Sequence, residues 1–148
     1  MPKLVETNFS IADELRLLAP STKNGLLYGK PGHYLSERAT LDLAKLLSRQ
    51  SDAFIDIGAN EGLFTFFVAA ALGPSRQSSI HAFEPDPFLF DRLTGNIGRN
   101  NMNVRANRIA VSDRVGTQTF YRNISDDLSG SLTTFSPANT RSPQPKPM

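Results

Sequence analysis

The fold is decided by one stretch in the first half of the chain, residues 54–62, which reads Phe54-Ile55-Asp56-Ile57-Gly58-Ala59-Asn60-Glu61-Gly62. Ala53–Ile57 is a short apolar segment, as expected of a strand buried on both faces of a parallel sheet. Gly58–Gly62 supplies glycines for a tight turn. The run Leu63–Leu72 is apolar almost all round and stops before Gly73 and Pro74, which favours a buried helix.

The same alternation continues along the chain. A second apolar strand is predicted at Ser79–Phe83, and a helix begins after it at Asp86 and Pro87. We expect this helix to end at Asn100 and a third strand to lie within 103–111. Strands that alternate with helices are typical of a parallel sheet with right-handed crossovers. The sequence therefore predicts an α/β protein with a Rossmann-like, doubly wound parallel sheet.

Outside this alternation the sequence predicts shorter elements. A helix is expected from Ser36 to about Arg49, and a shorter one over Ser10–Ala19. Thr117–Arg122 is expected to form a strand in a hairpin, after a turn at 113–116. Residues 136–148 contain four prolines and no Leu, Ile, Val or Phe, a composition typical of a disordered tail.

Composition and charge exclude several classes of site. The 148 residues have room for one domain, and an apolar fraction of 39% supports only a small core. The net charge is only +2, so no nucleic-acid-binding surface is indicated. The absence of cysteine excludes a disulfide scaffold and a cysteine-based zinc site. The two histidines and the scattered carboxylates have no metal-ligand spacing, so no metal site is predicted.

Hydropathy gives a prediction of location. Residues 1–20 carry acidic side chains and lack the apolar run of a signal peptide. The longest apolar stretch is shorter than the roughly 20 residues that a membrane-spanning helix needs. We therefore expect a cytoplasmic protein that makes no contact with a membrane.

A ligand site is predicted where the first two strands end. Gly58 and Gly62 allow the backbone to turn sharply and to approach a ligand closely. Glu84 follows the second strand, and its two oxygens can accept hydrogen bonds from both hydroxyls of a ribose. Because open α/β sheets bind ligands at the carboxyl ends of their strands, these residues predict a nucleoside-binding edge.

The charges of the turn favour a cationic ligand. A dinucleotide-binding turn follows the pattern G-x-G-x-x-G, whereas this turn has two glycines. Asp56 and Glu61 would place negative charge where a pyrophosphate sits. S-adenosyl-L-methionine carries a sulfonium and an ammonium that Asp56 can complement, while amides of the turn receive its carboxylate. A module that binds NAD or FAD stays an alternative, since Glu84 suits any ribose.

Four segments together resemble the FkbM family of S-adenosylmethionine-dependent methyltransferases. They are Phe54–Gly62, Ala82–Pro87, Asn96-Ile97 with Asn100, and Ala110–Asp113 with Gly116. The resemblance extends over residues 35–135 and implies a class I, Rossmann-like fold. It also implies methyl transfer to an oxygen of a sugar or a secondary metabolite, so that the acceptor is a small molecule or a glycan.

The resemblance further assigns cofactor-binding residues. The methionine end of the cofactor would lie at the turn formed by Asp56, Gly58, Ala59, Asn60 and Gly62. Glu84 would hold the ribose, and Ala110 would lie against the adenine. No catalytic base is assigned.

The sequence departs from the family after the third strand. The family continues into a fourth parallel strand with an Ile-Lys-Ile-Asp-Val-Glu-Gly-like motif, which this sequence lacks. We therefore expect an N-terminal extension at 1–35, a partial, cofactor-binding methyltransferase domain at 36–135 and the tail at 136–148. A non-catalytic truncated fragment is a second alternative. Without the fourth strand, one edge of the Phe54–Ile57 strand would be open and would favour self-association.

Overall fold

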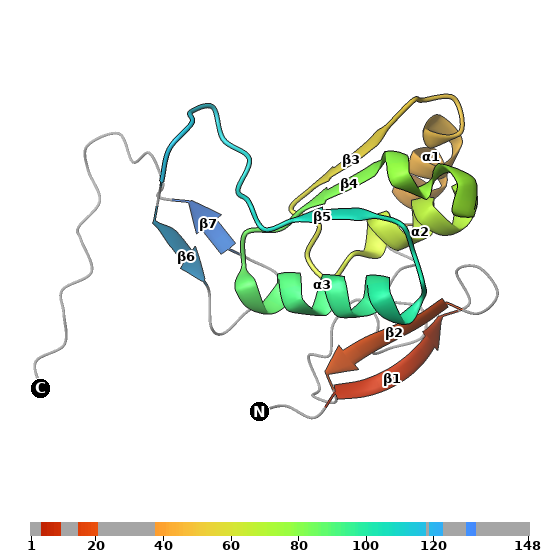
Figure 1. Cartoon of the computed structure of the whole chain (residues 1–148), viewed down its shortest axis with the longest axis horizontal. Coiled ribbons are helices and arrows are strands. Elements are labelled where there is room, and N and C mark those ends of the chain that lie inside the picture. The colour runs from red at the N-terminus through yellow and green to blue at the C-terminus, as the bar shows by residue number, and fades with distance from the viewer. Residues whose placement is uncertain (1–3, 10–14, 21–37, 118, 123–129, 133–148) are drawn as a thin grey trace, which may run out of the picture. The chain divides into compact units, whose positions relative to one another are not determined.

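The computed structural model describes residues 4–9, 15–20, 38–117, 119–122 and 130–132. The chain divides into two compact units, Met1–Asp113 and Arg114–Met148. The first contains β1 (Leu4–Phe9), β2 (Leu15–Pro20), α1 (Arg38–Ser48), β3 (Phe54–Ile57), α2 (Leu63–Leu72), the 3₁₀ helix η2 (Pro74–Ser79), β4 (Ile80–Phe83), α3 (Pro87–Arg99) and β5 (Arg105–Asn107) (Figure 1). The second contains β6 (Phe120–Arg122) and β7 (Gly130–Leu132).

A three-stranded parallel sheet, in the order β3-β4-β5, is the centre of the first unit. Asp56 of β3 is in register with Ala82 of β4, which is in register with Ala106 of β5. The order places β3 at one edge, where it pairs with β4 alone among the described residues. The predicted α/β class and the parallel strands are confirmed, and β5 lies within the range 103–111 predicted to contain the third strand.

The helices that connect these strands begin and end where the sequence predicts. Helix α2 spans the predicted residues, and the amide of Gly73 donates to the carbonyl of Ala69 at its end. Helix α3 begins at Pro87 after Asp86, whose carboxylate accepts hydrogen bonds from the amides of Phe88 and Leu89. These two helices therefore have the cap and the stop that their sequences predict.

The core lies on one face of the sheet, between the strands and the helices. Buried side chains of this core come from α1, α2, β4 and α3, among them Leu41, Phe66, Phe67, Ala82 and Leu93. On the opposite face Ile55 and Ile57 are 60% and 62% exposed. The prediction that this strand is buried on both faces is therefore wrong for the described part of the chain, because no described element covers the second face.

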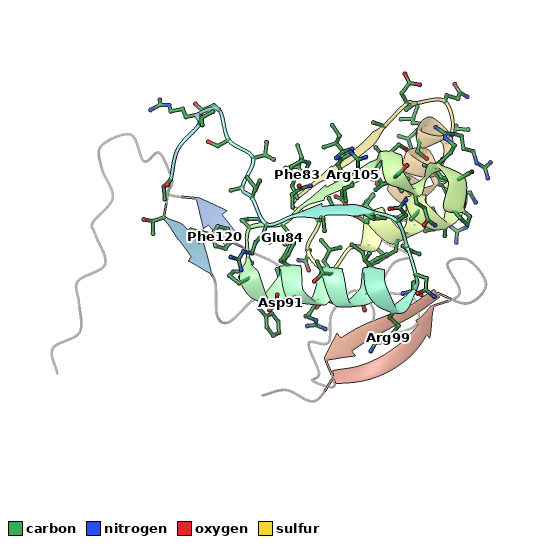
Figure 2. The ribbon with its side chains drawn as sticks, in the orientation of Figure 1. Phe83, Glu84, Asp91, Arg99, Arg105 and Phe120 are labelled. Atoms are coloured by element: carbon green, nitrogen blue, oxygen red, sulfur yellow. The ribbon has the colours of Figure 1, made fainter. Side chains whose placement is uncertain are left out.

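The second face shows a regular arrangement of side chains. The register places Ile55, His81 and Arg105 in one row across the strands, and Ile57, Phe83 and Asn107 in the next. Figure 2 shows Phe83 and Arg105 on the side of the sheet away from α3. The apolar side chains of this face thus lie on β3 and β4, next to the open edge.

An arginine binds the backbone carbonyls of the segment that connects α1 to β3. Arg76 of η2 donates from Nη1 to the carbonyl of Arg49 at 3.1 Å and from Nη2 to the carbonyl of Ser48 at 3.3 Å. Its Nη2 also donates to the carbonyl of Ser51. The last carbonyls of a helix accept no hydrogen bond from within the helix. The guanidinium of Arg76 donates hydrogen bonds to carbonyls at the end of α1 and just after it.

Two sequence predictions about the flanking regions are wrong. Residues 15–20 form strand β2, antiparallel to β1, where the sequence predicts the end of a helix over Ser10–Ala19. A helix of that length is marginal in water, and pairing with β1 satisfies the backbone instead. The strand predicted at Thr117–Arg122 exists as β6, but it pairs with β7 and not with the third parallel strand. The predicted boundaries at 35/36 and 135/136, the cap at Ser36 and the predicted tail at 136–148 lie outside the described residues.

Candidate functional site

The candidate site is the turn Gly58–Gly62, which leads from β3 into α2. The amides of Gly58 and Ala59 both donate to the carbonyl of Phe83, at 2.9 and 3.0 Å. The amide of Gly62 donates to the carbonyl of Ala59 at 2.8 Å. These bonds hold the turn against the carboxyl end of β4, which is the edge where the sequence predicts a ligand.

Three residues of the turn have left-handed backbone conformations. They are Gly58, Asn60 and Gly62, with φ angles of 75°, 54° and 99°. Asparagine tolerates this conformation better than most residues, and the side-chain oxygen of Asn60 accepts a hydrogen bond from the amide of Glu61 at 2.7 Å. The residue types at these positions therefore follow from the backbone that the turn requires.

The two glycines of the turn have different surroundings. A Cβ at Gly62 would lie 2.4 Å from Cε2 of Phe66 and 2.7 Å from Cδ1 of Leu93, so a side chain there overlaps the core. A Cβ at Gly58 would meet no atom of a described residue within 4 Å, its neighbours in the chain excepted. Packing therefore requires glycine at position 62, whereas Gly58 leaves open space beside the backbone.

Asp56 caps helix α2 from the preceding strand. Its Oδ2 accepts a hydrogen bond from the amide of Thr65 at 3.0 Å and another from the Thr65 hydroxyl. Gly62 at the N-cap position has no side chain that could do this. Burial raises the pKa of Asp56, although the hydrogen bonds from Thr65 oppose the shift. The carboxylate thus lies at the N-terminus of α2, where an anionic ligand group would otherwise bind.

Glu84 joins the turn to the beginning of α3. Its Oε2 accepts from the amide of Asn60 and its Oε1 from the amide of Asp86, both at 2.8 Å. Figure 2 shows Glu84 near the N-terminal end of α3. Burial raises the pKa of Glu84, the two amides lower it, and the charges of Asp86 and Asp56 raise it further. Each carboxylate oxygen has a second lone pair, so the group retains capacity to accept from a ligand.

The backbone amides of the turn are all engaged within the protein. Those of Gly58, Ala59 and Gly62 donate to carbonyls, the amide of Asn60 donates to Glu84, and that of Glu61 donates to the side chain of Asn60. A ligand carboxylate could therefore bind one of these five amides only by displacing an acceptor that holds the turn.

Glu61 does not lie where the sequence places it. Its side chain is fully buried, and its Oε1 lies 2.6 Å from Nη1 of Arg92 on α3. The expectation that Glu61 adds negative charge at a pyrophosphate position is therefore wrong, because an arginine in the core compensates that charge. The argument from the Asp56 carboxylate stands, because Asp56 lies at the helix N-terminus.

Sequence reasoning did not single out Thr65 and Arg92 as part of this region. For Arg92 a signal exists in the helical spacing, since it is three residues after Leu89 and four before Asn96, both of which are buried. An arginine on the apolar face of a helix needs a buried partner. For Thr65 the only signal is its place in the first turn of α2, three residues after Gly62.

The remaining assignments are less constrained. Ala59 is buried within the turn, at 5% exposure. Ala110 is half-buried in the irregular segment after β5, and its place beside an adenine stays a prediction. In the parts of the chain that the structure describes, no three His, Asp or Glu side chains are grouped so that they could hold a metal ion. No described helix has the length and apolar character needed to cross a membrane.

Comparison with known proteins gives one similar sequence. No protein-family model matches the chain. Over 75 residues, 49% of this chain, it is 40% identical to the 31-O-demethyl-FK506 methyltransferase FkbM of Streptomyces tacrolimicus. The match covers 28% of that protein, so the chain corresponds to little more than a quarter of its curated relative. The predicted resemblance to FkbM is confirmed over this stretch.

Two solved structures of methyltransferases resemble the chain weakly. The S-adenosylmethionine-dependent methyltransferase from Agrobacterium tumefaciens has a TM-score of 0.49 at 10% identity, over 73% of this chain and 33% of that one. The tRNA (uracil-54, C5)-methyltransferase of Pyrococcus abyssi, in complex with S-adenosyl-L-homocysteine, has a TM-score of 0.47 at 15% identity, over 78% of this chain and 26% of that one.

Proposed function

We propose that the turn Gly58–Gly62 and Glu84 form the S-adenosyl-L-methionine site of a methyltransferase. The observation that carries this proposal is the 2.8 Å hydrogen bond from the amide of Asn60 to Glu84. This bond places a carboxylate directly beside the glycine turn. A nucleoside site at this edge of the sheet needs both a group that accepts from the ribose and a backbone that the ligand can approach closely. The second lone pairs of Glu84 would accept the two ribose hydroxyls. The similarity to the FkbM methyltransferase supports this ligand.

The open side of the turn supports the placement of the methionine end. Among the described residues, and apart from the neighbours of Gly58 in the chain, no atom lies within 4 Å of the position that a Cβ would take at Gly58, so a ligand could approach the backbone there. Asp56, whose carboxylate lies at the N-terminus of α2, would complement the positive groups of the cofactor. Ala59, Asn60 and Gly62 would form the rest of the wall, and Ala110 would lie near the adenine.

The bound cofactor would supply an activated methyl group for transfer to an oxygen. We propose a hydroxyl of a sugar or of a secondary metabolite as the acceptor, and thus a small molecule or a glycan. The contribution of this chain would be to position the cofactor against that hydroxyl. A general base for the hydroxyl proton is not assigned to any residue. The match covers 28% of the curated relative, so the proposal assigns to this chain the binding of the cofactor and leaves the groups that bind the acceptor unassigned.

Isothermal titration of the full chain with S-adenosyl-L-homocysteine tests the site. We expect binding at a single site, and a loss of affinity of about tenfold or more in Glu84→Gln, since charge-assisted hydrogen bonds contribute about 1.5–3 kcal/mol each. Asp42→Asn is the matched control, because it makes the same chemical change at an exposed carboxylate on α1. Circular dichroism establishes that both variants are folded.

The outcome also separates the alternatives. A folded chain that binds neither S-adenosyl-L-homocysteine nor NAD would contradict the proposal and favour the non-catalytic fragment. Binding of NAD in preference to S-adenosyl-L-homocysteine would favour the dinucleotide module. We expect the reverse preference, because the Asp56 carboxylate lies at the N-terminus of α2, where a pyrophosphate would bind.

A further inference from the structure

A buried ion pair connects the turn to the middle of α3. Nη1 of Arg92 lies 2.6 Å from Oε1 of Glu61, and the two side chains are 4% and 0% exposed. The guanidinium also lies over the ring of Phe88, 5.4 Å from its centre and one helical turn earlier. Glu61 is therefore fixed in the core while the residues on either side of it, Asn60 and Gly62, have left-handed backbones.

The ion pair closes a ring of contacts that includes Glu84. The carboxylate of Glu84 binds the amides of Asn60 in the turn and of Asp86, the cap of α3. Helix α3 then carries Arg92, six residues beyond its cap, back to Glu61, whose own amide donates to the side chain of Asn60. The turn is thus held from two directions, by Glu84 on one side and by Arg92 on the other.

Such a pair is an inefficient source of stability. Two charges that leave water lose their hydration, and replacement of both by apolar side chains of similar volume is often neutral or stabilising. The 2.6 Å contact of this ion pair, between two buried side chains, restricts how far the turn can move away from α3. Because three residues of the turn have left-handed backbones, we expect this restriction to act on the conformation of the turn more than on the free energy of unfolding.

We propose that Glu61 and Arg92 are positioning residues for the nucleoside site. Their ion pair holds the turn so that the amide of Asn60 stays against Glu84, and Glu84 in turn keeps the orientation in which its remaining lone pairs meet a ribose. Neither residue touches the ligand. The identity of the ligand rests on the proposed function, whereas the restraint on the turn is a property of this chain alone.

The double variant Glu61→Leu/Arg92→Met tests this role in the full chain. It removes both charges at similar volume, and the exposed pair of α1, changed as Arg38→Met/Asp42→Leu, is the matched control because its partners are 2.9 Å apart and about half exposed. Three measurements are made on each protein: the melting temperature, hydrogen exchange of the amides of residues 60–62 by NMR, and the affinity for S-adenosyl-L-homocysteine by calorimetry.

We expect the double variant to melt within a few degrees of the parent. Its turn amides should exchange faster and its affinity for S-adenosyl-L-homocysteine should fall, each by about fivefold or more, the lower end of typical coupling between sites. The control pair should change neither quantity. The single variant Glu61→Asp keeps a buried ion pair with Arg92 but loses packing volume. Its turn amides should be better protected than those of the double variant, which a loss of packing volume alone would not explain.

The possible failures can be distinguished. If the double variant retains both the exchange rates and the affinity of the parent, the positioning role is wrong. If it melts far below the parent, the pair is a source of stability and the proposal is likewise wrong. If the parent does not bind S-adenosyl-L-homocysteine but the turn amides of the double variant still exchange faster, the proposed function fails and the restraint on the turn stands.

Discussion

The two glycines of the turn have the same backbone requirement but different surroundings, which makes them a matched pair for mutation. Both have positive φ, at 75° for Gly58 and 99° for Gly62. Alanine in a left-handed conformation costs about 1–2 kcal/mol at either position. Only at Gly62 would the new methyl group overlap Phe66 and Leu93, at 2.4 and 2.7 Å. Overpacking of this kind adds about 1–3 kcal/mol.

We therefore expect Gly58→Ala to lower the free energy of unfolding by about 1–2 kcal/mol and Gly62→Ala by about 2–5 kcal/mol. Urea titration followed by circular dichroism measures both, and the slope of the free energy against urea should stay constant. Gly98→Ala in α3 is the control, because its added Cβ meets nothing within 4 Å and its φ is not positive. It should stabilise the chain by about 0.5–1 kcal/mol.

For ligand affinity we expect the opposite order, with a larger loss in Gly58→Ala than in Gly62→Ala. Gly58→Ala places a methyl group in the open space where we propose that the methionine end approaches, so its affinity for S-adenosyl-L-homocysteine should fall by about tenfold or more. The folded fraction of Gly62→Ala should bind more tightly than Gly58→Ala, because the methyl group of Gly62→Ala points into the core. Equal losses of stability in the two variants would refute the packing argument. Unchanged affinity in Gly58→Ala would refute the placement of the ligand.

Three further predictions follow from other contacts. Arg76→Ala should lower the free energy of unfolding by about 1.5–3 kcal/mol, because it removes a charged donor from the carbonyls of Ser48, Arg49 and Ser51; a melting curve equal to that of the parent would contradict this. Burial raises the pKa of Asp56 and of Glu84 above their ordinary values of 3.8 and 4.5. The stability that these two groups contribute is therefore fully present below those values and is lost as pH rises through the folded-state pKa values. As the pH falls from 7 to 4, urea titration should show that Asp56→Asn/Glu84→Gln gains less stability, or loses more, than the parent; an identical pH dependence would contradict the shifts. Among the described strands, β3 lies at an edge of the sheet, and we expect the chain to associate there as its concentration rises. Ile57→Lys, at a position 62% exposed on the adjoining face, should reduce this in light scattering without lowering the melting temperature. A parent chain that stays monomeric would refute the role of this edge.

The sequence predicts the strand, turn and helix at residues 54–72 well because their causes are local. Gly58 and Gly62 within the segment, and Gly73 directly after it, have the positive φ angles that glycine adopts most readily. Asp86 followed by Pro87 specifies the start of α3 in the same way, since the cap binds amides two and three residues ahead. The conformations of the turn and of the start of α3 depend on residues close by in the sequence, so the local sequence is enough to predict them.

The contacts that define the site depend on positions far apart in the chain, and the sequence predicts them less well. The pair Glu61–Arg92 requires α3 to cross the turn at one particular angle, which no local pattern contains. The cap that Asp56 provides for Thr65 requires the strand to end beside the helix it precedes. The strands β2 and β6 differ from prediction for a related reason, because each is paired with a partner that the local pattern does not identify.

The structural roles of Asp56 and Glu84 change the way in which the site discriminates between ligands. Both carboxylates hold the protein together before any ligand binds, through Thr65, Asn60 and Asp86. A ligand with a pyrophosphate over the N-terminus of α2 would have to displace Asp56 and leave the amide of Thr65 without its acceptor. A ligand that adds donors to the second lone pairs of Glu84 disrupts nothing. We therefore expect the proposed preference for a nucleoside with positive charge to depend on Asp56, since Arg92 compensates the charge of Glu61 in the core.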